Sequence, residues 1–341
     1  MASVYLARRA EGAVAVKLLS RIHADADAPS MFLEEARIVT MLDHENIARV
    51  FDVDVTPDGQ HYLAMEYVHG TDLRELLSAA AHANRPLPYE TAIAVIMAAA
   101  AGLDHAHRRC DPHGKPLRLV HRDVSLSNIM VGYDGVVKVV DFGIATTALR
   151  TIQTLPGVVR GKASYMSPEQ CLGDRVDQRA DVFALGIVLY ELTTGARCFS
   201  GSNDFARMLA VVRGDYALPH DVVPNFPSEL EQVIRCALSI DPALRFPSAA
   251  ALAEALGHVL RDRGWIGGAA AIARTMAELF GQVPEPWAMI AAEPSATERH
   301  PAFALRLARG TEVPAFDDED DDDRTRGRRP LRRSPPRLTL V

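Results

Sequence analysis

The sequence predicts an α+β fold in which a small, β-rich N-terminal lobe is followed by a larger, mainly helical lobe. Up to Gly70, short valine-rich runs are separated by turn residues, as at 10–12 and 57–59, which is typical of strands. Beyond Gly70, apolar residues recur at helical spacing. The length of 341 residues and the apolar content of 48% allow one large two-lobed unit plus an appendage.

The individual elements follow from these patterns. A hairpin is expected from strands at 3–7 and 13–18, because a turn-forming Ala-Glu-Gly separates them. The spacing of Phe32, Ala36, Val39 and Leu42 predicts a helix over 30–42. Further strands are predicted at 46–55 and 60–67, and helices at 72–81, 89–107, 181–193, 228–237, 248–261 and 269–280.

Composition limits the possible partners and location. The formal net charge of −7 predicts no nucleic-acid partner. The four cysteines lie far apart, without metal-ligand spacing or a disulfide framework, which predicts a reducing, cytoplasmic setting. No secretory signal is visible, and the most apolar stretch, 92–103, is too short to cross a bilayer, so no membrane segment is expected.

Two motifs carry the chemistry. Residues 121–128 read HRDVSLSN, and residues 141–143 read DFG after the β-like runs 129–131 and 136–140. An aspartate and an asparagine five positions apart in one loop can face a substrate hydroxyl and a metal ion respectively. Aspartate and asparagine supply the hard oxygen donors that Mg²⁺ prefers. A chance occurrence of both motifs, thirteen residues apart, is improbable.

With these motifs, residues 1–262 resemble the bacterial eukaryotic-like serine/threonine protein kinases. The resemblance implies a protein-kinase-like two-lobed fold, with ATP and Mg²⁺ as cofactors and protein substrates as partners. It also implies transfer of the ATP γ-phosphate to serine or threonine hydroxyls. The lobes are expected at 1–65 and 71–262 with a hinge at 66–70. A helical or irregular extension follows at 263–310, and a disordered acidic, then Arg/Pro-rich tail at 311–341.

The resemblance assigns the catalytic roles residue by residue. Asp123 would be the catalytic base or the group that orients the hydroxyl, and Asn128 and Asp141 would be the protein ligands of Mg²⁺. Lys17 would contact the α- and β-phosphates and pair with Glu35 on the predicted helix, with Glu34 as the rival register.

The nucleotide pocket is assigned in the same way. Met65 would border the adenine, backbone groups of Glu66 and Val68 would hydrogen-bond its edge, and Asp72 would reach the ribose. Val4 and Ala15 complete the residues assigned to the pocket.

Four structural and regulatory expectations extend the match. Glu169, in the Ser-Pro-Glu at 167–169, is expected to pair with Arg245, and Asp181 to hold the backbone of the His121-Arg122 turn. His121 and Phe142 are expected to be packing residues of an internal spine. Arg122 is expected to pair with a phosphate on the activation segment, whose nearby hydroxyls are Thr146, Thr147, Thr151, Thr154 and, less favoured, Ser164.

Two departures from the family pattern shape the alternatives. Ser125 replaces the usual lysine after the catalytic aspartate, and Lys162 stands where threonine is usual, so Lys162 is a candidate catalytic cation. The chain also begins inside the glycine-rich loop, with Ala2 at the third glycine, and we expect the functional start to lie upstream of Met1. The rival interpretation is a pseudokinase scaffold. A small-molecule phosphotransferase is disfavoured by Glu169 and Arg245.

Overall fold

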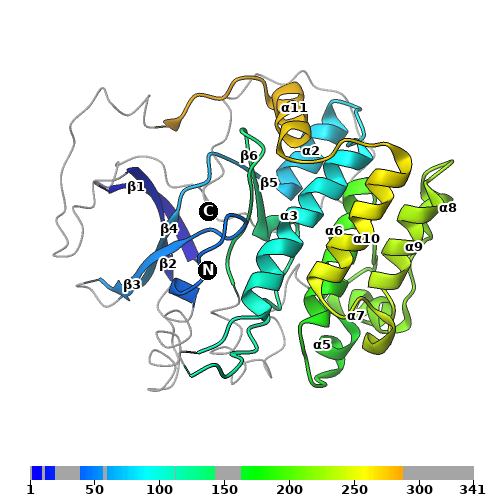
Figure 1. The fold of residues 1–341 in the computed structure, drawn as a ribbon, viewed down its shortest axis with the longest axis horizontal. Helices are drawn as coiled ribbons and strands as arrows, with labels where there is room; N and C mark the ends of the chain where they lie inside the picture. Colours follow the sequence, from blue (N-terminus) through cyan, green and yellow to red (C-terminus); the bar gives the residue numbers. More distant parts are fainter. Residues whose placement is uncertain are drawn as a thin grey trace.

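The computed structural model describes residues 2–9, 12–19, 39–56, 60–111, 113–142 and 163–286, and these form a two-lobed α+β fold (Figure 1). A β-sheet occupies the left of the view, and the helices gather on the right. The predicted fold class is therefore confirmed.

The N-terminal sheet is antiparallel, in the strand order β1-β2-β4-β3. Its strands are β1 (Ala2–Arg9), β2 (Gly12–Leu19), β3 (Val50–Val55) and β4 (His61–Glu66). Along β2, Val14 and Val16 belong to one apolar cluster, whereas Ala15 between them lies in the main core with Met65. Because side chains alternate along a strand, Lys17 shares the face of Ala15.

The strand predicted at 46–55 begins only at Val50, so its first four residues were assigned wrongly. Asn46 and Ala48 bond instead to Val139: the N–H of Ala48 donates to the carbonyl of Val139 at 2.9 Å. The N–H of Val139 in turn donates to Asn46 at 2.8 Å. Ile47 forms an isolated parallel bridge with Val139. This segment thus ties the two lobes together.

A second, three-stranded sheet lies at the junction, in the order β5 (Gly70–Asp72), β6 (Ile129–Gly132) and β7 (Val137–Val139). At Gly70 a side chain would meet the carbonyl oxygen of Val131 at 2.0 Å, so this close pairing requires glycine. Strand β6 directly follows the motif at 121–128, and β7 precedes the motif at 141–143.

The helical lobe is built around α3 (Tyr89–His107) and α6 (Arg179–Thr194), which are buried along most of their length. Around them lie α2 (Leu73–His82), α5 (Pro168–Leu172), α7 (Asp204–Arg213), α8 (Pro219–Val222), α9 (Ser228–Ala237) and α10 (Ala249–Arg263). Helix α11 (Ala269–Phe280) follows. Three 3-10 turns are Leu126–Asn128, Ala163–Tyr165 and Pro242–Leu244. The helices predicted in this lobe are confirmed.

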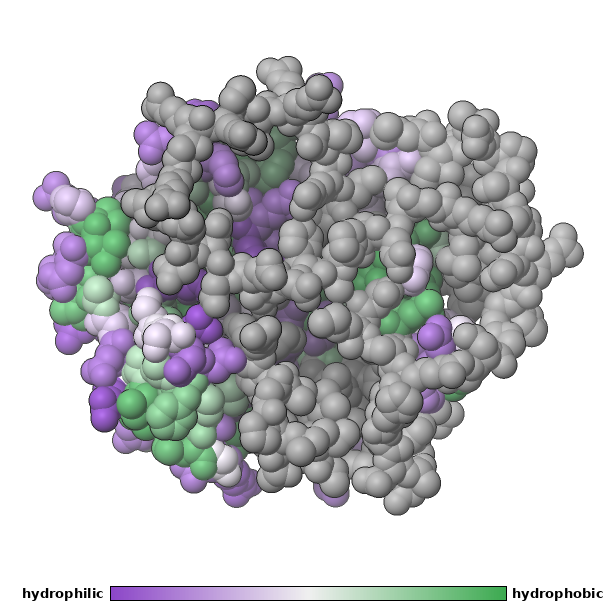
Figure 2. Space-filling view, turned by 180° about the vertical axis from the view of Figure 1, so that it is seen from behind, coloured by the Kyte–Doolittle hydropathy of each residue, from purple (hydrophilic) through white to green (hydrophobic). Residues whose placement is uncertain are grey.

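Helix α7 was not predicted, because its apolar residues do not mark a buried face. Val211 is its one buried residue, whereas Phe205 is 74% exposed. Figure 2 shows apolar residues gathering at the lower left, on the side of the lobe where α5 and α7 lie. Leu172 on α5 and Leu209 on α7 are also exposed. In the described ranges, no helix combines the length and apolar character needed to span a membrane.

Candidate active site

The loop between α3 and β6 holds the predicted catalytic base beside a predicted metal ligand. The side-chain amide of Asn128 donates to the backbone carbonyl of Asp123 at 2.7 Å and to its Oδ2 at 3.0 Å. The carbonyl of Asn128 accepts from the N–H of Val140 at 3.0 Å, which attaches the loop to the strand preceding Asp141. The amide oxygen of Asn128 is the atom that this orientation leaves for a cation.

Asp181 fixes the backbone ahead of Asp123. Its carboxylate accepts from the N–H of His121 at 2.8 Å and from the N–H of Arg122 at 2.9 Å, as predicted. Arg122 has a φ of 64°, an unfavourable left-handed conformation that these bonds hold in place. The buried Nε2 of His107 lies 2.7 Å from the same carboxylate. No motif in the sequence predicts this role for His107.

The charge on Asp181 is maintained despite complete burial. Burial raises the pKa of a carboxyl group, but the hydrogen bond from His107, the nearby imidazoles and the N–H of His121 outweigh it. The pKa of Asp181 therefore lies below its ordinary value. A buried anion thus anchors the catalytic loop.

His121 and Phe142 pack against each other, as predicted. Their ring centroids are 4.6 Å apart, and both side chains are buried. The Nε2 of His121 donates to the carbonyl of Val140 at 2.9 Å, so this nitrogen has a structural role. This packing holds the Asp141-Phe142 dipeptide against the catalytic loop.

Lys17 and Asp141 meet across the two lobes. The Nζ of Lys17 lies 2.6 Å from Oδ2 of Asp141, and both side chains are about one quarter exposed. Asp141 follows β7 with a φ of 57°, a conformation that aspartate tolerates better than most residues. The structure thus brings the predicted phosphate-binding cation and metal ligand together.

Several predicted residues lie outside the described ranges. These are Glu35 and its rival Glu34, Lys162, Gly143 and the four activation-segment threonines. Their assignments remain predictions.

The residues assigned to the adenine pocket line the junction of β2, β4 and the hinge. Ala15 pairs with Met65 in the sheet register, and both are buried. Val68 is buried, and Val4 pairs with Lys17 at the start of β1. All four residues belong to the main core or pack against it, and their contact with adenine stays a prediction.

The acidic side chains at the hinge have structural partners. Glu66 forms an ion pair with Lys138 at 2.8 Å and accepts from the N–H of Arg49 at 3.1 Å. Asp72 caps α2 by accepting from the N–H of Glu75 at 2.8 Å. Burial raises the pKa of Asp72. Its predicted ribose contact stays a prediction.

The donor set fits Mg²⁺. Asp141 offers carboxylate oxygens and Asn128 an amide oxygen, and hard oxygen donors are what Mg²⁺ prefers. With few protein ligands, the remaining positions would be left for water and for phosphate oxygens.

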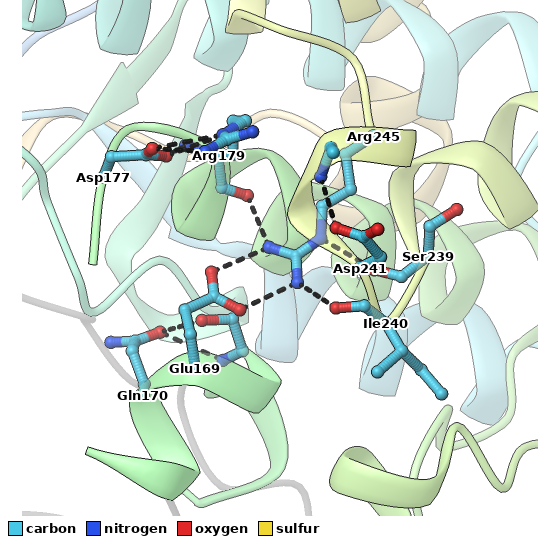
Figure 3. A network of polar contacts seen from close by, with 10 residues as sticks. Glu169, Gln170, Asp177, Arg179, Ser239, Ile240, Asp241 and Arg245 are labelled. Atoms are coloured by element: carbon cyan, nitrogen blue, oxygen red, sulfur yellow. Dashed lines mark hydrogen bonds and ion pairs between the residues drawn. The ribbon is translucent and has the colours of Figure 1, made fainter. Parts of the chain in front are cut away.

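The predicted pair of Glu169 and Arg245 is present and buried (Figure 3). Both contacts between the guanidinium and the carboxylate are 2.8 Å, which makes the pair bidentate. Arg245 also donates to the carbonyls of Arg179, Ser239 and Ile240. Burial opposes the charge on Glu169, but the bond from Arg245 keeps its pKa below the ordinary value.

Gln170 links this network to the catalytic loop. It closes a capping box with Ser167 at the start of α5, and its Nε2 donates to the carbonyl of Arg122 at 3.0 Å. The Ser-Gln spacing of a capping box is visible in the sequence, but the contact with Arg122 is not.

Comparison with known proteins identifies the family. Residues 1–258 match the protein kinase domain. The chain belongs to the protein kinase domain family. Over 268 residues this kinase chain is 39% identical to the tyrosine-protein kinase MasK of Myxococcus xanthus, covering 77% of the chain and 41% of MasK.

Two further relatives are named serine/threonine-protein kinases. PrkC of Bacillus subtilis is 34% identical, over 73% of this kinase chain and 37% of PrkC. PknL of Mycobacterium tuberculosis is 35% identical, over 74% of the chain and 61% of PknL. The kinase chain thus spans less than two thirds of the length of these relatives.

A solved structure supports the fold. The kinase domain of PknI from Mycobacterium tuberculosis superimposes with a TM-score of 0.58 at 29% identity, covering 76% of this kinase chain and 91% of that one.

Proposed function

We propose that this chain is a protein kinase that transfers the γ-phosphate of ATP to serine or threonine hydroxyls of proteins, with Mg²⁺ as cofactor. The observation that carries the proposal is the contact of Lys17 with Asp141 at 2.6 Å, beside a loop in which Asn128 holds Asp123. Phosphoryl transfer depends mainly on positioned charges of this kind.

Each residue has a definite task. Asp123 orients the substrate hydroxyl and accepts its proton as the oxygen forms a bond to the γ-phosphorus, while the bond from that phosphorus to the β-phosphate oxygen breaks. Asn128 and Asp141 would hold Mg²⁺, which supplies positive charge to the phosphate oxygens when bound. Lys17 would turn from Asp141 toward the α- and β-phosphates.

Dependence on ATP and the four unpaired cysteines support a cytoplasmic location.

We further propose that activation requires autophosphorylation between Thr146 and Thr154. Arg122 supports this, because its backbone is fixed by Asp181 and its carbonyl accepts from Gln170. A phosphate on the activation segment could pair with this arginine. Peptide mapping after incubation with Mg-ATP tests the proposal, and an active preparation without phosphate in this segment would contradict it.

Intact-mass measurement in Mg-ATP tests the main proposal. The wild-type chain should gain mass in steps of one phosphate, whereas Asp123→Asn should gain none under the same conditions. Phosphoamino-acid analysis then identifies the acceptor, because MasK is named a tyrosine kinase whereas PrkC and PknL are named serine/threonine kinases. Phosphate on tyrosine alone would overturn the serine/threonine assignment.

A second candidate is a pseudokinase scaffold that binds nucleotide without turnover. Ser125 favours it, because this buried residue occupies the usual lysine position and its hydroxyl pairs with that of Ser127 at 3.0 Å. Nucleotide binding without any gain of phosphate would select this candidate.

A further inference from the structure

Helix α11 lies beyond the residues that match the kinase family, yet it packs on the helical lobe. Ile272 and Met276 are buried in the main core. The hydroxyl of Thr275 lies 2.9 Å from that of Thr91 on α3, and both residues are buried. At Gly135, in the β6–β7 turn, a side chain would meet the carbonyl of Ala269 at 2.1 Å. Helix α11 is thus an integral part of the folded unit.

Residues 281–286, here called the hinge strap, leave α11 toward the β-rich lobe (Figure 1). The Nε2 of His69 donates to the carbonyl of Val283 at 3.0 Å. His69 lies in the segment predicted to be the hinge. The hinge strap therefore contacts the hinge itself.

Aromatic packing surrounds this hydrogen bond. The ring of Tyr133 lies 4.9 Å from that of His69 and 5.8 Å from that of Phe280, the last residue of α11. Tyr67 precedes His69 in the hinge, and the centroids of their rings are 6.4 Å apart. Burial, with Tyr133 and Glu285 nearby, raises the pKa of Tyr67 to about 12. The strap and the hinge thus share one packed cluster.

The end of the hinge is held from two directions. The carbonyl of His69 accepts from the N–H of Tyr133 at 3.0 Å, and Gly70 begins the pairing with β6. The side chain of His69 provides the second attachment, to Val283. With both in place, the backbone of Val68, which precedes His69, has little freedom to shift.

We propose that His69 is a positioning residue for nucleotide binding, through which the hinge strap fixes the backbone that recognises adenine. This inference rests on the proposed function. Hydrogen bonds to a flat ring edge require accurate backbone placement, and a hinge ordered in advance loses less conformational freedom when the nucleotide binds. Losing the bond to Val283 should therefore weaken nucleotide affinity more than it slows chemistry at Asp123.

Two variants of the full chain separate the hydrogen bond from the packing. His69→Phe keeps an aromatic ring against Tyr133 but removes the donor, whereas His69→Gln restores a donor near the position of Nε2. Arg85→Ala is the matched control, because its exposed ion pair with Glu278 at 3.3 Å attaches α11 to the lobe away from the hinge.

Nucleotide affinity, turnover and amide exchange in the hinge test the role of His69. His69→Phe should raise the Kd for Mg-ADP and the KM for ATP by about threefold to tenfold, the usual effect of one neutral hydrogen bond, with kcat within about twofold of wild type. Amide exchange of residues 66–70 without nucleotide should speed up in the same variant. His69→Gln should recover most of both effects, and Arg85→Ala should show neither.

Unchanged ADP affinity and hinge exchange in a folded His69→Phe variant would overturn the inference, as would equal effects in Arg85→Ala. Because ADP affinity is measured without turnover, a wild-type chain that binds ADP but transfers no phosphate rejects the proposed function and still decides the role of His69. A wild-type chain without ADP affinity would overturn both.

Discussion

Lys17 and Asp141 form an ion pair of 2.6 Å that joins the β-rich lobe to the segment after β7. In the proposed reaction the two residues serve different partners, since Lys17 contacts phosphates and Asp141 holds a cation. In the ion pair, the positive charge of Lys17 and the negative charge of Asp141 neutralise each other. Each side chain is about one quarter exposed, so solvent screens the attraction and a nucleotide with its cation can compete for both groups.

Asp141→Asn should reduce phosphate transfer by about a hundredfold or more, because an anionic group that holds the cation at the phosphates is lost. The fold should survive, since asparagine also tolerates a φ of 57°. Initial rates with Mg²⁺ as the only divalent ion, together with thermal unfolding, measure the two effects. Asp221→Asn, at an exposed carboxylate on α8, is the control and should behave as wild type. Near-normal turnover of Asp141→Asn would remove Asp141 from the site.

Asp181→Asn should lower the free energy of unfolding by about 2–3 kcal/mol at pH 7, because charged hydrogen bonds to the N–H groups of His121 and Arg122 are weakened. The pKa of Asp181 in the folded chain lies below its ordinary value of 3.8. Its stabilising contribution is therefore complete above that ordinary value and is lost as the pH falls through the folded pKa.

Urea unfolding of both proteins at pH 5, 4 and 3 tests this sign. The difference between wild type and Asp181→Asn should be largest at pH 5 and should shrink as the pH falls below 3.8. Other carboxylates, such as Glu169, titrate in both proteins and cancel in the difference. A difference that grew on acidification would contradict the assignment.

Glu169→Ala should destabilise the helical lobe by roughly 3 kcal/mol or more, because Arg245 would remain buried without its carboxylate partner. Asp177→Ala is a matched control from the same network: Asp177 also binds an arginine, Arg179, at 2.7 Å, but the two side chains are 49% and 34% exposed (Figure 3). Screened pairs of this kind contribute below about 1 kcal/mol. Equal losses in the two variants, measured by chemical unfolding, would show that burial does not set the strength of the Glu169 pair.

Much of the fold could be predicted because its signals are local. Helix α3 runs from Tyr89 to His107 as predicted, since a continuous apolar pattern marks a helix buried on nearly every side. Two long-range contacts could be predicted only from the family resemblance, which says which residues pair. These are Glu169 with Arg245, and Asp181 with the His121 turn.

The rest could not be predicted because it depends on contacts between distant residues. Strand β5 has three residues, too few for an alternating pattern, and is defined by its pairing with β6. The contact of His107 with Asp181 joins residues 74 positions apart, and no motif links them. The bond between His69 and Val283 spans 214 positions and involves a backbone carbonyl, for which a sequence has no signal.

Ser125 and Lys162 lead to the last prediction. The buried Ser125 hydroxyl pairs with Ser127 and carries no charge, so this position of the catalytic loop lacks the ammonium group usual in the family. We propose that Lys162, which lies outside the described residues, supplies the missing charge near the transferring phosphate, where stabilisation is most effective.

Lys162→Ala should then lower kcat by about tenfold to a hundredfold, and adding Ser125→Lys should restore part of the loss. Lys115→Ala, at an exposed lysine of the loop after α3, is the control for loss of a positive charge and should leave kcat unchanged. Partial rescue is the informative result, because a structural defect at position 162 would not be repaired by a charge placed at 125. If Lys162→Ala turns over as fast as wild type, the kinase works without this cation and the proposal for Lys162 is wrong. If neither protein transfers phosphate, the scaffold alternative is favoured.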